Sequence, residues 1–127
     1  MQPGLAVAVV SFSYRHGLPR EADLVFDVRF LANPHYQADL RELTGRDPAV
    51  GAHIEADPAF GRFFSDLTAM LLPLLPGFER EGKSYLTLAV GCTGGRHRSV
   101  ALIEELRPFI EGLGLAPTVV HRDLDRE

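Results

Sequence analysis

The stretch SYLTLAVGCTGGRHRSVALIEEL, from Ser84 to Leu106, joins two apolar segments through a loop rich in glycine and positive charge. The apolar run Tyr85–Val90 predicts a buried strand, and the spacing of apolar residues from Ser99 onward predicts a helix. We expect Pro108 to kink that helix. A strand, a glycine-rich turn and a helix in this order are typical of α/β domains, in which ligands lie at the carboxyl ends of strands.

The rest of the chain repeats this alternation. Further strands are predicted at Leu5–Phe12, at Asp23–Leu31 and within residues 117–124. Asp47-Pro48 and Asp57-Pro58 each predict a helix start, with aspartate as N-cap and proline at the first helical position. We expect the second of these helices to be limited by Pro73 and Pro76, and residues 37–45 to form two helical turns that stop at Gly45. The sequence therefore predicts one α/β domain over residues 1–127, with a mainly parallel sheet and flanking helices.

The composition excludes several classes of protein. The chain has 127 residues, 46% of them hydrophobic, and a formal net charge of −4, which argues against a general nucleic-acid binder. One cysteine forms no intramolecular disulfide and suits a reducing compartment. The N-terminal run LAVAVVSF is too short to span a bilayer and lacks the features of a secretory signal. We expect a cytoplasmic protein with no membrane association.

The loop CTGGRHRS, Cys92 to Ser99, has the chemistry of an anion site. Gly94 and Gly95 allow successive backbone amides to converge, and the start of a helix adds partial positive charge. Arg98 supplies a planar fork for phosphate, while Thr93 and Ser99 supply hydroxyls, and Ser99 is also a candidate N-cap. The loop has neither G-x-x-x-x-G-K-[ST] nor G-x-G-x-x-G, so it does not predict hydrolysis of a nucleoside triphosphate.

Cys92 leaves two interpretations open. The spacing C-x5-R-S, from Cys92 through Ser99, also occurs in cysteine-dependent phosphatases, where a thiolate attacks a phosphate held by the loop. Against that chemistry, Gly91 stands where such phosphatases usually have histidine, and no aspartate loop stands out as a general acid. The alternative is that Cys92 is a small, partly buried residue whose backbone binds the anion, and we favour this one.

Asp27 and Arg29 interrupt the second apolar run at spacing i, i+2, which places both on one face of a strand. Asp27 is either a hydrogen-bonded structural carboxylate or a ligand for an amine or hydroxyl group. The five histidines show no metal-binding spacing, so neither a metal nor another cofactor is expected.

Four segments of the chain resemble one known family: FDVRFLANPHY, LRELTGRDPAV, GKSYLTLAVGCTGGRHRSV and the closing HRDL. They are similar to the C-terminal domain of the RapZ family of RNase adapter proteins, which are also named nucleotide-binding proteins. The similarity runs from about Val10 to Leu124. It implies a phosphofructokinase-like regulatory domain that binds glucosamine 6-phosphate and is linked to RNA-based control of cell-envelope precursor synthesis.

Carried over position by position, the resemblance implies a specific set of ligand-binding residues. These are Asp27, Arg29, Asn33, His35, Cys92, Thr93, Gly94, Gly95, His97 and Arg98, with Ser99 beside them. The loop would take the phosphate, while Asp27 and His35 would reach the amine or hydroxyls of the sugar. The kinase-like P-loop domain that precedes this domain in full-length members has no counterpart here, so we expect either a homo-oligomer or an N-terminal domain as partner.

Two alternative functions follow from other classes. One is a phosphatase of small phosphomonoesters with Cys92 and Arg98 as catalytic residues. The other is an RNA-binding or RNase adapter module with Arg96 and Arg122 as phosphate contacts. The family's basic tail is replaced here by the nearly neutral HRDLDRE. The leading hypothesis remains a regulatory sensor that makes and breaks no bond.

Overall fold

Four parallel strands form the centre of the fold in the computed structural model, which describes residues 4–126. The strands are β1 (Ala6–Ser13), β2 (Leu24–Asp27), β3 (Tyr85–Cys92) and β4 (Thr118–His121), in the order β2-β3-β1-β4. The pairing places Ser13 opposite Cys92 and Asp27 opposite Gly91, so β1, β2 and β3 all end at the same edge of the sheet. The prediction of a single α/β domain with parallel strands is confirmed.

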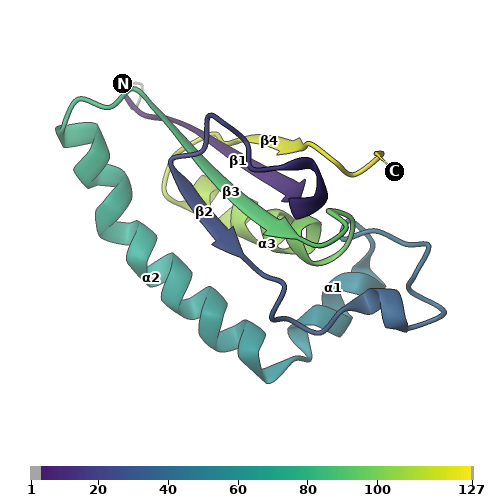
Figure 1. Ribbon diagram of the computed structural model, residues 1–127. Coiled ribbons are helices and arrows are strands. Elements are labelled where there is room, and N and C mark those ends of the chain that lie inside the picture. Colours follow the sequence, from purple (N-terminus) through teal and green to yellow (C-terminus); the bar gives the residue numbers. More distant parts are fainter. Residues whose placement is uncertain (1–3, 127) are drawn as a thin grey trace.

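Three α-helices and two short 3-10 turns connect the strands. The helices are α1 (Pro48–Glu55), α2 (Pro58–Arg80) and α3 (Arg98–Gly112), and the turns are η1 (Tyr14–His16) and η2 (Pro34–Tyr36). In Figure 1, α3 lies behind the strands and α2 runs diagonally along their outer side. Leucines of α2 and α3 meet alternate side chains of β1 and β3 in one main hydrophobic core.

The two faces of the sheet are covered unequally. Val7, Val9, Leu86 and Leu88 point into the main core, whereas the opposite face holds a small cluster around Val10, Phe12 and Ala89. On that second face Tyr85 is 76% exposed, and Val25 and Val120 are about 40% exposed. The hydrophobic contribution to stability is roughly proportional to the apolar area removed from water. The face that the helices cover therefore contributes most of it.

Both Asp-Pro helix starts are confirmed, but the two prolines do not end α2. Asp57 caps α2 through a hydrogen bond from the amide of Ala59, and α2 continues through Pro73 and Pro76 to Arg80. A proline inside a helix leaves the carbonyl four residues earlier without its usual donor. Both prolines are exposed, so water can solvate those carbonyls and the helix persists.

The second predicted strand is shorter than expected. β2 ends at Asp27, whose carboxylate accepts a hydrogen bond from the amide of Arg29 at 2.9 Å and turns the chain. This local side-chain bond competes with the ladder, so Arg29 follows the strand rather than lying in it.

The two helical turns predicted for residues 37–45 are absent. The segment consists of isolated turns, and its carbonyls at Glu42 and Leu43 accept hydrogen bonds from the guanidinium of Arg96. Gly45 approaches α3 so closely that a Cβ atom there would lie 2.3 Å from the amide nitrogen of Ala101. Docking against α3 overrides the local helical preference.

The start of α3 also differs from the sequence prediction. His97, not Ser99, is the N-cap residue, and its side chain makes no capping bond. Pro108 lies within α3 as predicted, at an exposed position.

Candidate anion-binding site at the carboxyl edge of the sheet

The loop between β3 and α3 holds a row of backbone donors without partners. Within residues 4–126, the amides of residues 93–97 donate no hydrogen bond to a protein acceptor. Gly95 has φ +68°, a left-handed conformation that only glycine adopts without strain. Amides that turn through such a conformation at the start of a helix form a concave site for anions.

Ser13 fixes this loop from the neighbouring strand. Its hydroxyl donates to the carbonyl of Thr93 at 2.6 Å, and a Cβ atom at Gly95 would lie 3.0 Å from Ser13. The first turn of α3 contains no acidic residue. Because the carboxylate usually found there is missing, the partial positive charge of the helix start is left for an external anion.

Arg98 is buried beneath the loop, with 4% of its surface exposed. Its Nη1 donates to the carbonyls of Arg29 and Leu31, at 2.7 and 3.1 Å, and its Nη2 donates to Thr93 Oγ1 at 3.4 Å. Its Nε is buried without a partner in the described residues. The guanidinium is therefore anchored by neutral carbonyls and forms no ion pair within residues 4–126, although its charge helps to lower the pKa of Asp27; this arrangement favours a negative ligand.

His97 lies beside Arg98 and is 6% exposed. Burial lowers the pKa of His97, with nearby Arg96 acting in the same direction, so the imidazole is neutral at pH 7. Its Nε2 has no hydrogen-bond partner among the described residues. A buried polar atom left unpaired is costly, and a ligand atom that satisfied it would gain that energy.

A hollow of about 420 Å³ opens beside these groups. Of the residues expected to bind the ligand, it is lined by Asn33, His35, Cys92, Thr93, Gly94, His97 and Arg98. Arg96, which we considered as an RNA contact, also lines it. The parallel topology thus brings segments around residue 33 and residue 95 to one place.

Four of the expected ligand residues do not line this hollow. They are Asp27, Arg29, Gly95 and Ser99. Asp27 and Arg29 form an ion pair at 2.6 Å, and the Arg29 guanidinium lies 4.0 Å from the centre of the Tyr14 ring. Hydrogen bonds from Arg29 hold the pKa of Asp27 below its usual value, so this carboxylate is charged. Arg122, the other residue considered for RNA, donates to Asp123 and to the carbonyl of Gly17.

Sequence reasoning missed one wall of the hollow. Ser13, Arg15 and His16 line it from the end of β1, and Tyr36 and Arg126 complete it. The rule that placed the site at the carboxyl ends of strands applies to β1 as much as to β3, and it could have identified the first three. Arg126 carries no such signal, because its position depends on how the chain turns after β4.

Cys92 lies at the base of the loop and is buried. Its Sγ lies 3.1 Å from the hydroxyl of Ser99 and accepts the Ser99 amide at 3.4 Å. The thiol is therefore held between the strand end and the first turn of α3, with the loop amides above it.

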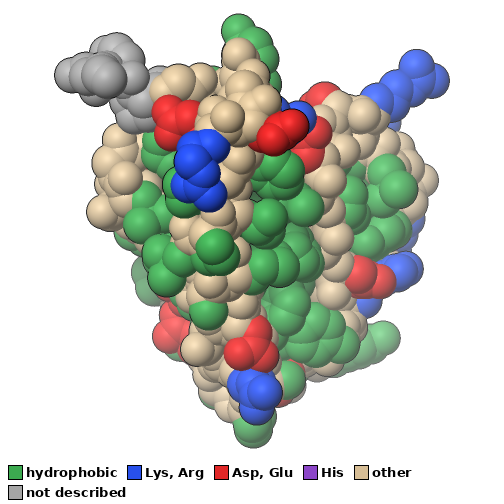
Figure 2. All heavy atoms as spheres, turned by 90° about the vertical axis from the view of Figure 1, so that its left-hand side faces the viewer, with side chains coloured by type: hydrophobic (Ala, Val, Ile, Leu, Met, Phe, Trp, Pro, Cys, Tyr) green, Lys and Arg blue, Asp and Glu red, His purple; other side chains and the backbone are tan. Residues whose placement is uncertain are grey.

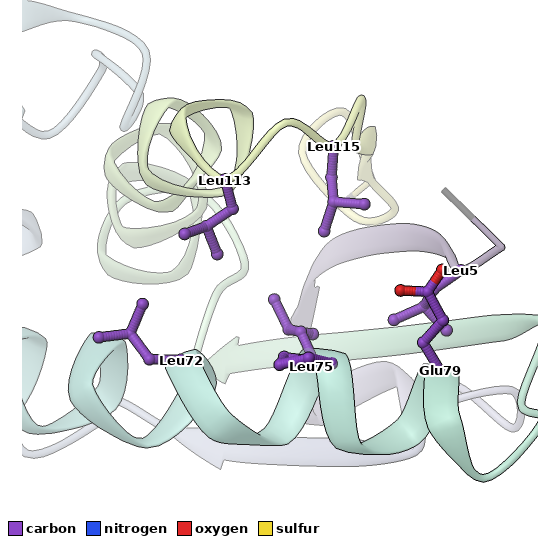
Figure 3. A pocket seen from close by; sticks show the side chains of 7 residues that line it. Leu5, Leu72, Leu75, Glu79, Leu113 and Leu115 are labelled. Carbon is purple, nitrogen blue, oxygen red and sulfur yellow. The ribbon is translucent and has the colours of Figure 1, made fainter. Parts of the chain in front are cut away.

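A second hollow, of about 330 Å³, lies at the amino edge of the sheet and has a different character. Figure 3 shows Leu72 and Leu75 of α2 pointing toward Leu113 and Leu115, with Leu5 and Glu79 at one end. Figure 2 looks onto this side, where hydrophobic side chains gather along the surface. We call these residues the apolar groove. Its lining has no cation and no hydrogen-bonding network, so it does not suit a phosphate.

Two other kinds of site are not found in the part of the chain that the structure describes. No group of three or more histidine, cysteine, aspartate or glutamate residues there is arranged to hold a metal ion. No helix within residues 4–126 is long and apolar enough to cross a bilayer.

Comparison with known proteins places nearly the whole chain in one family. The sequence model of the RapZ C-terminal domain matches residues 5–125. A nucleotide-binding protein of Paramagnetospirillum magneticum is 64% identical over 122 residues, which cover 96% of this chain and 40% of the relative. Nucleotide-binding proteins of Rhodospirillum rubrum and Frankia alni are 58% and 53% identical, and the matches cover 39% and 45% of their lengths. The chain thus spans about two fifths of these relatives.

Proposed function

The chain belongs to the RapZ C-terminal domain family, and on this premise we propose that it is a cytoplasmic regulatory module that binds a phosphorylated amino sugar, such as glucosamine 6-phosphate. The observation that carries the proposal is the row of unpaired amides of residues 93–97 above the buried Arg98. Loop amides, a helix start and a guanidinium are the donors that a phosphate monoester needs.

The hollow itself supports the phosphate more strongly than the amine. No carboxylate lines it among the described residues. In the proposal, recognition of the amino group rests on the charged Asp27, which pairs with Gly91 of β3 just below the loop. Asn33 and His35 supply groups for the hydroxyls.

The test measures ligand-induced stabilisation. We expect glucosamine 6-phosphate to raise the melting temperature, and a ligand at 100 times its Kd stabilises the folded state by about 2.7 kcal/mol. Inorganic phosphate should give a smaller shift and unphosphorylated glucosamine none. The absence of a shift with every sugar phosphate would contradict the proposal.

Two sets of variants locate the ligand. Arg98→Lys keeps the charge but loses the planar fork, and we expect it to remove most of the shift, whereas Arg62→Ala on the remote surface of α2 should leave it unchanged. Asp27→Asn should bring the shift with glucosamine 6-phosphate down to that with glucose 6-phosphate. An unchanged preference for the amino sugar would exclude Asp27 as the amine ligand.

The contact between Cys92 and Ser99 favours a second candidate function, a cysteine-dependent phosphatase. The Cys92 thiol donates to the hydroxyl of Ser99, the residue after the arginine, and accepts the Ser99 amide; a nucleophilic thiolate at this position would accept from both groups. Turnover of an aryl phosphate that disappears in Cys92→Ser, with the ligand-induced shift retained, would establish this activity. Absence of turnover in the unaltered chain would exclude the phosphatase and leave the regulatory module as the proposed function.

The remaining expectations about partners stay predictions. An RNA or RNase partner receives limited support from Arg96 and Arg122, because their guanidinium groups already donate to protein acceptors. Assembly with a second copy, or with the N-terminal part that accompanies this domain in the longer relatives, likewise stays a prediction.

A further inference from the structure

The chain turns back toward the anion site after β4, over Arg122–Arg126. Asp123 is at the centre of this turn and is 1% exposed. Its Oδ2 accepts hydrogen bonds from the Ser13 amide at 2.7 Å and from Arg122 Nη2 at 2.8 Å, and its Oδ1 accepts one from Arg126 Nη1 at 2.9 Å. Burial acts to raise the pKa of Asp123, but the hydrogen bonds from Arg122, Ser13 and Arg126 together lower it. The carboxylate is charged and fixed.

Asp123 connects this turn to the anion loop in two steps. Ser13, whose amide Asp123 holds, donates its hydroxyl to the carbonyl of Thr93. The backbone of Gly95 also packs here, because a Cβ atom at that position would lie 3.2 Å from Asp123 Cβ. The position of the loop and the position of the C-terminal turn are therefore set by one buried carboxylate.

Arg126, which donates to Asp123, also lines the hollow. Its side chain is 52% exposed, and within residues 4–126 only its Nη1 has a partner. Arg122 and Arg126 together carry two positive charges against the single charge of Asp123. The segment 122–126 also contains Asp125 and is neutral overall, but of these residues only Arg126 lines the hollow, so the turn presents a positive charge there, and the phosphate-binding loop lines the same hollow.

We propose that Arg126 is a further phosphate-contacting residue, positioned by Asp123, and that its contact with the ligand fastens the C-terminal turn over the occupied site. This inference rests on the proposed function, since it needs a phosphate at the loop. It adds a consequence that the loop alone does not have, because occupancy of the site is transmitted to the C-terminal end of the domain.

The first measurement is the Kd of glucosamine 6-phosphate and of inorganic phosphate, obtained by calorimetry on the whole chain. We expect Arg126→Ala to weaken both by about tenfold, the lower range for a charge-assisted hydrogen bond, and Arg126→Lys to recover part of the loss. Arg80→Ala, an exposed arginine at the end of α2, is the matched control and should leave both values unchanged.

A double-mutant cycle separates positioning from simple structural support. Asp123→Asn should weaken binding more in the unaltered chain than in the Arg126→Ala background, because the part of its effect that passes through Arg126 is lost there and only the part that passes through Ser13 and the loop remains. Asp125→Asn, the exposed neighbour, is the control. Equal losses from Asp123→Asn in both backgrounds would show that Asp123 does not act through Arg126 and would overturn the positioning role.

Hydrogen exchange tests the fastening of the turn. Ligand should increase protection of the amides of residues 122–126 in the unaltered chain and not in Arg126→Ala. Binding of unaltered affinity by Arg126→Ala would overturn this inference while leaving the proposed function intact. Failure of the unaltered chain to bind any phosphate ligand would overturn both.

Discussion

The two edges of the sheet present hollows of similar size and opposite chemistry. At the carboxyl edge, about 420 Å³ is lined by four arginines and by a loop whose amides lack partners. At the amino edge, the apolar groove of about 330 Å³ is lined by leucines, with Glu79 at its end. Parallel strands cause this difference, because all their carboxyl ends, and the helix starts that follow them, lie on one side.

The two edges differ in whether their side chains stabilise the fold or remain without partners. Side chains of the apolar groove continue into the main core and stabilise the fold, whereas the carboxyl edge leaves His97 Nε2 and Arg98 Nε buried without partners in the part of the chain that the structure describes. We therefore expect substitutions at the amino edge to change stability without changing ligand binding, and substitutions at the carboxyl edge to change ligand binding.

The largest effect on stability is expected at the groove's deep side. Leu75→Ala should lower the free energy of unfolding by about 2–5 kcal/mol, because Leu75 is 3% exposed and packs in the main core. Denaturant titration measures this value. The increase in melting temperature on adding a sugar phosphate should persist, and its loss would show that the two edges are coupled.

The sharpest test at the carboxyl edge is a pair of neighbouring glycines. Gly95→Ala should cost about 1–2 kcal/mol for its left-handed backbone and should also remove ligand binding, because the new Cβ would lie 3.0 Å from Ser13. Gly94→Ala is the control for stability, since a Cβ there meets nothing within 4 Å and its backbone is not left-handed. An equal loss of stability in the two variants would contradict the role assigned to the left-handed backbone of the loop.

A third test concerns the pH dependence of stability, away from both edges. A hydrogen bond with Glu55 raises the pKa of Glu105 to about 7, with burial and the charge of Glu55 acting in the same direction. The folded state therefore holds a proton that the unfolded chain loses near pH 4.5, and the free energy of unfolding should fall as pH rises from about 4.5 to about 7.

Glu105→Gln should flatten that decline, because the amide does not ionise, and should make the protein more stable than the unaltered chain above about pH 7. Denaturant titrations at several pH values measure this, with the exposed Glu111→Gln as control. A decline of unchanged slope in Glu105→Gln would assign the pH dependence to other groups.

The smallest effect is expected at the rim of the apolar groove. Leu72 is 51% exposed, so Leu72→Ala should change the free energy of unfolding by no more than about 0.5 kcal/mol. Ligand affinity should stay the same. A large loss of stability would mean that the groove is covered in solution.

The site residues that the sequence identified share a local signal. Cys92, Thr93, Gly94, His97 and Arg98 are contiguous with a strand and a helix start, so their chemistry could be read without knowing the fold. Asp27 and Arg29 were attractive for the same reason, yet they pair with each other outside the hollow. Local pattern finds charged residues near strand ends but does not tell which partner each will choose.

The sequence by itself determined the alternation of strands and helices, the two Asp-Pro helix starts and the gathering of glycines and arginines in the loop between β3 and α3. Each depends on residues close together in the chain, whose conformational preferences act locally. Only the tertiary structure decided that residues 37–45 would not form a helix, that α2 would continue through two prolines, and that Arg15 and Arg126 would complete the wall of the hollow. The first and third outcomes depend on contacts between distant segments, where burial and competing hydrogen bonds outweigh local propensity. The second depends on the exposure of Pro73 and Pro76 to water.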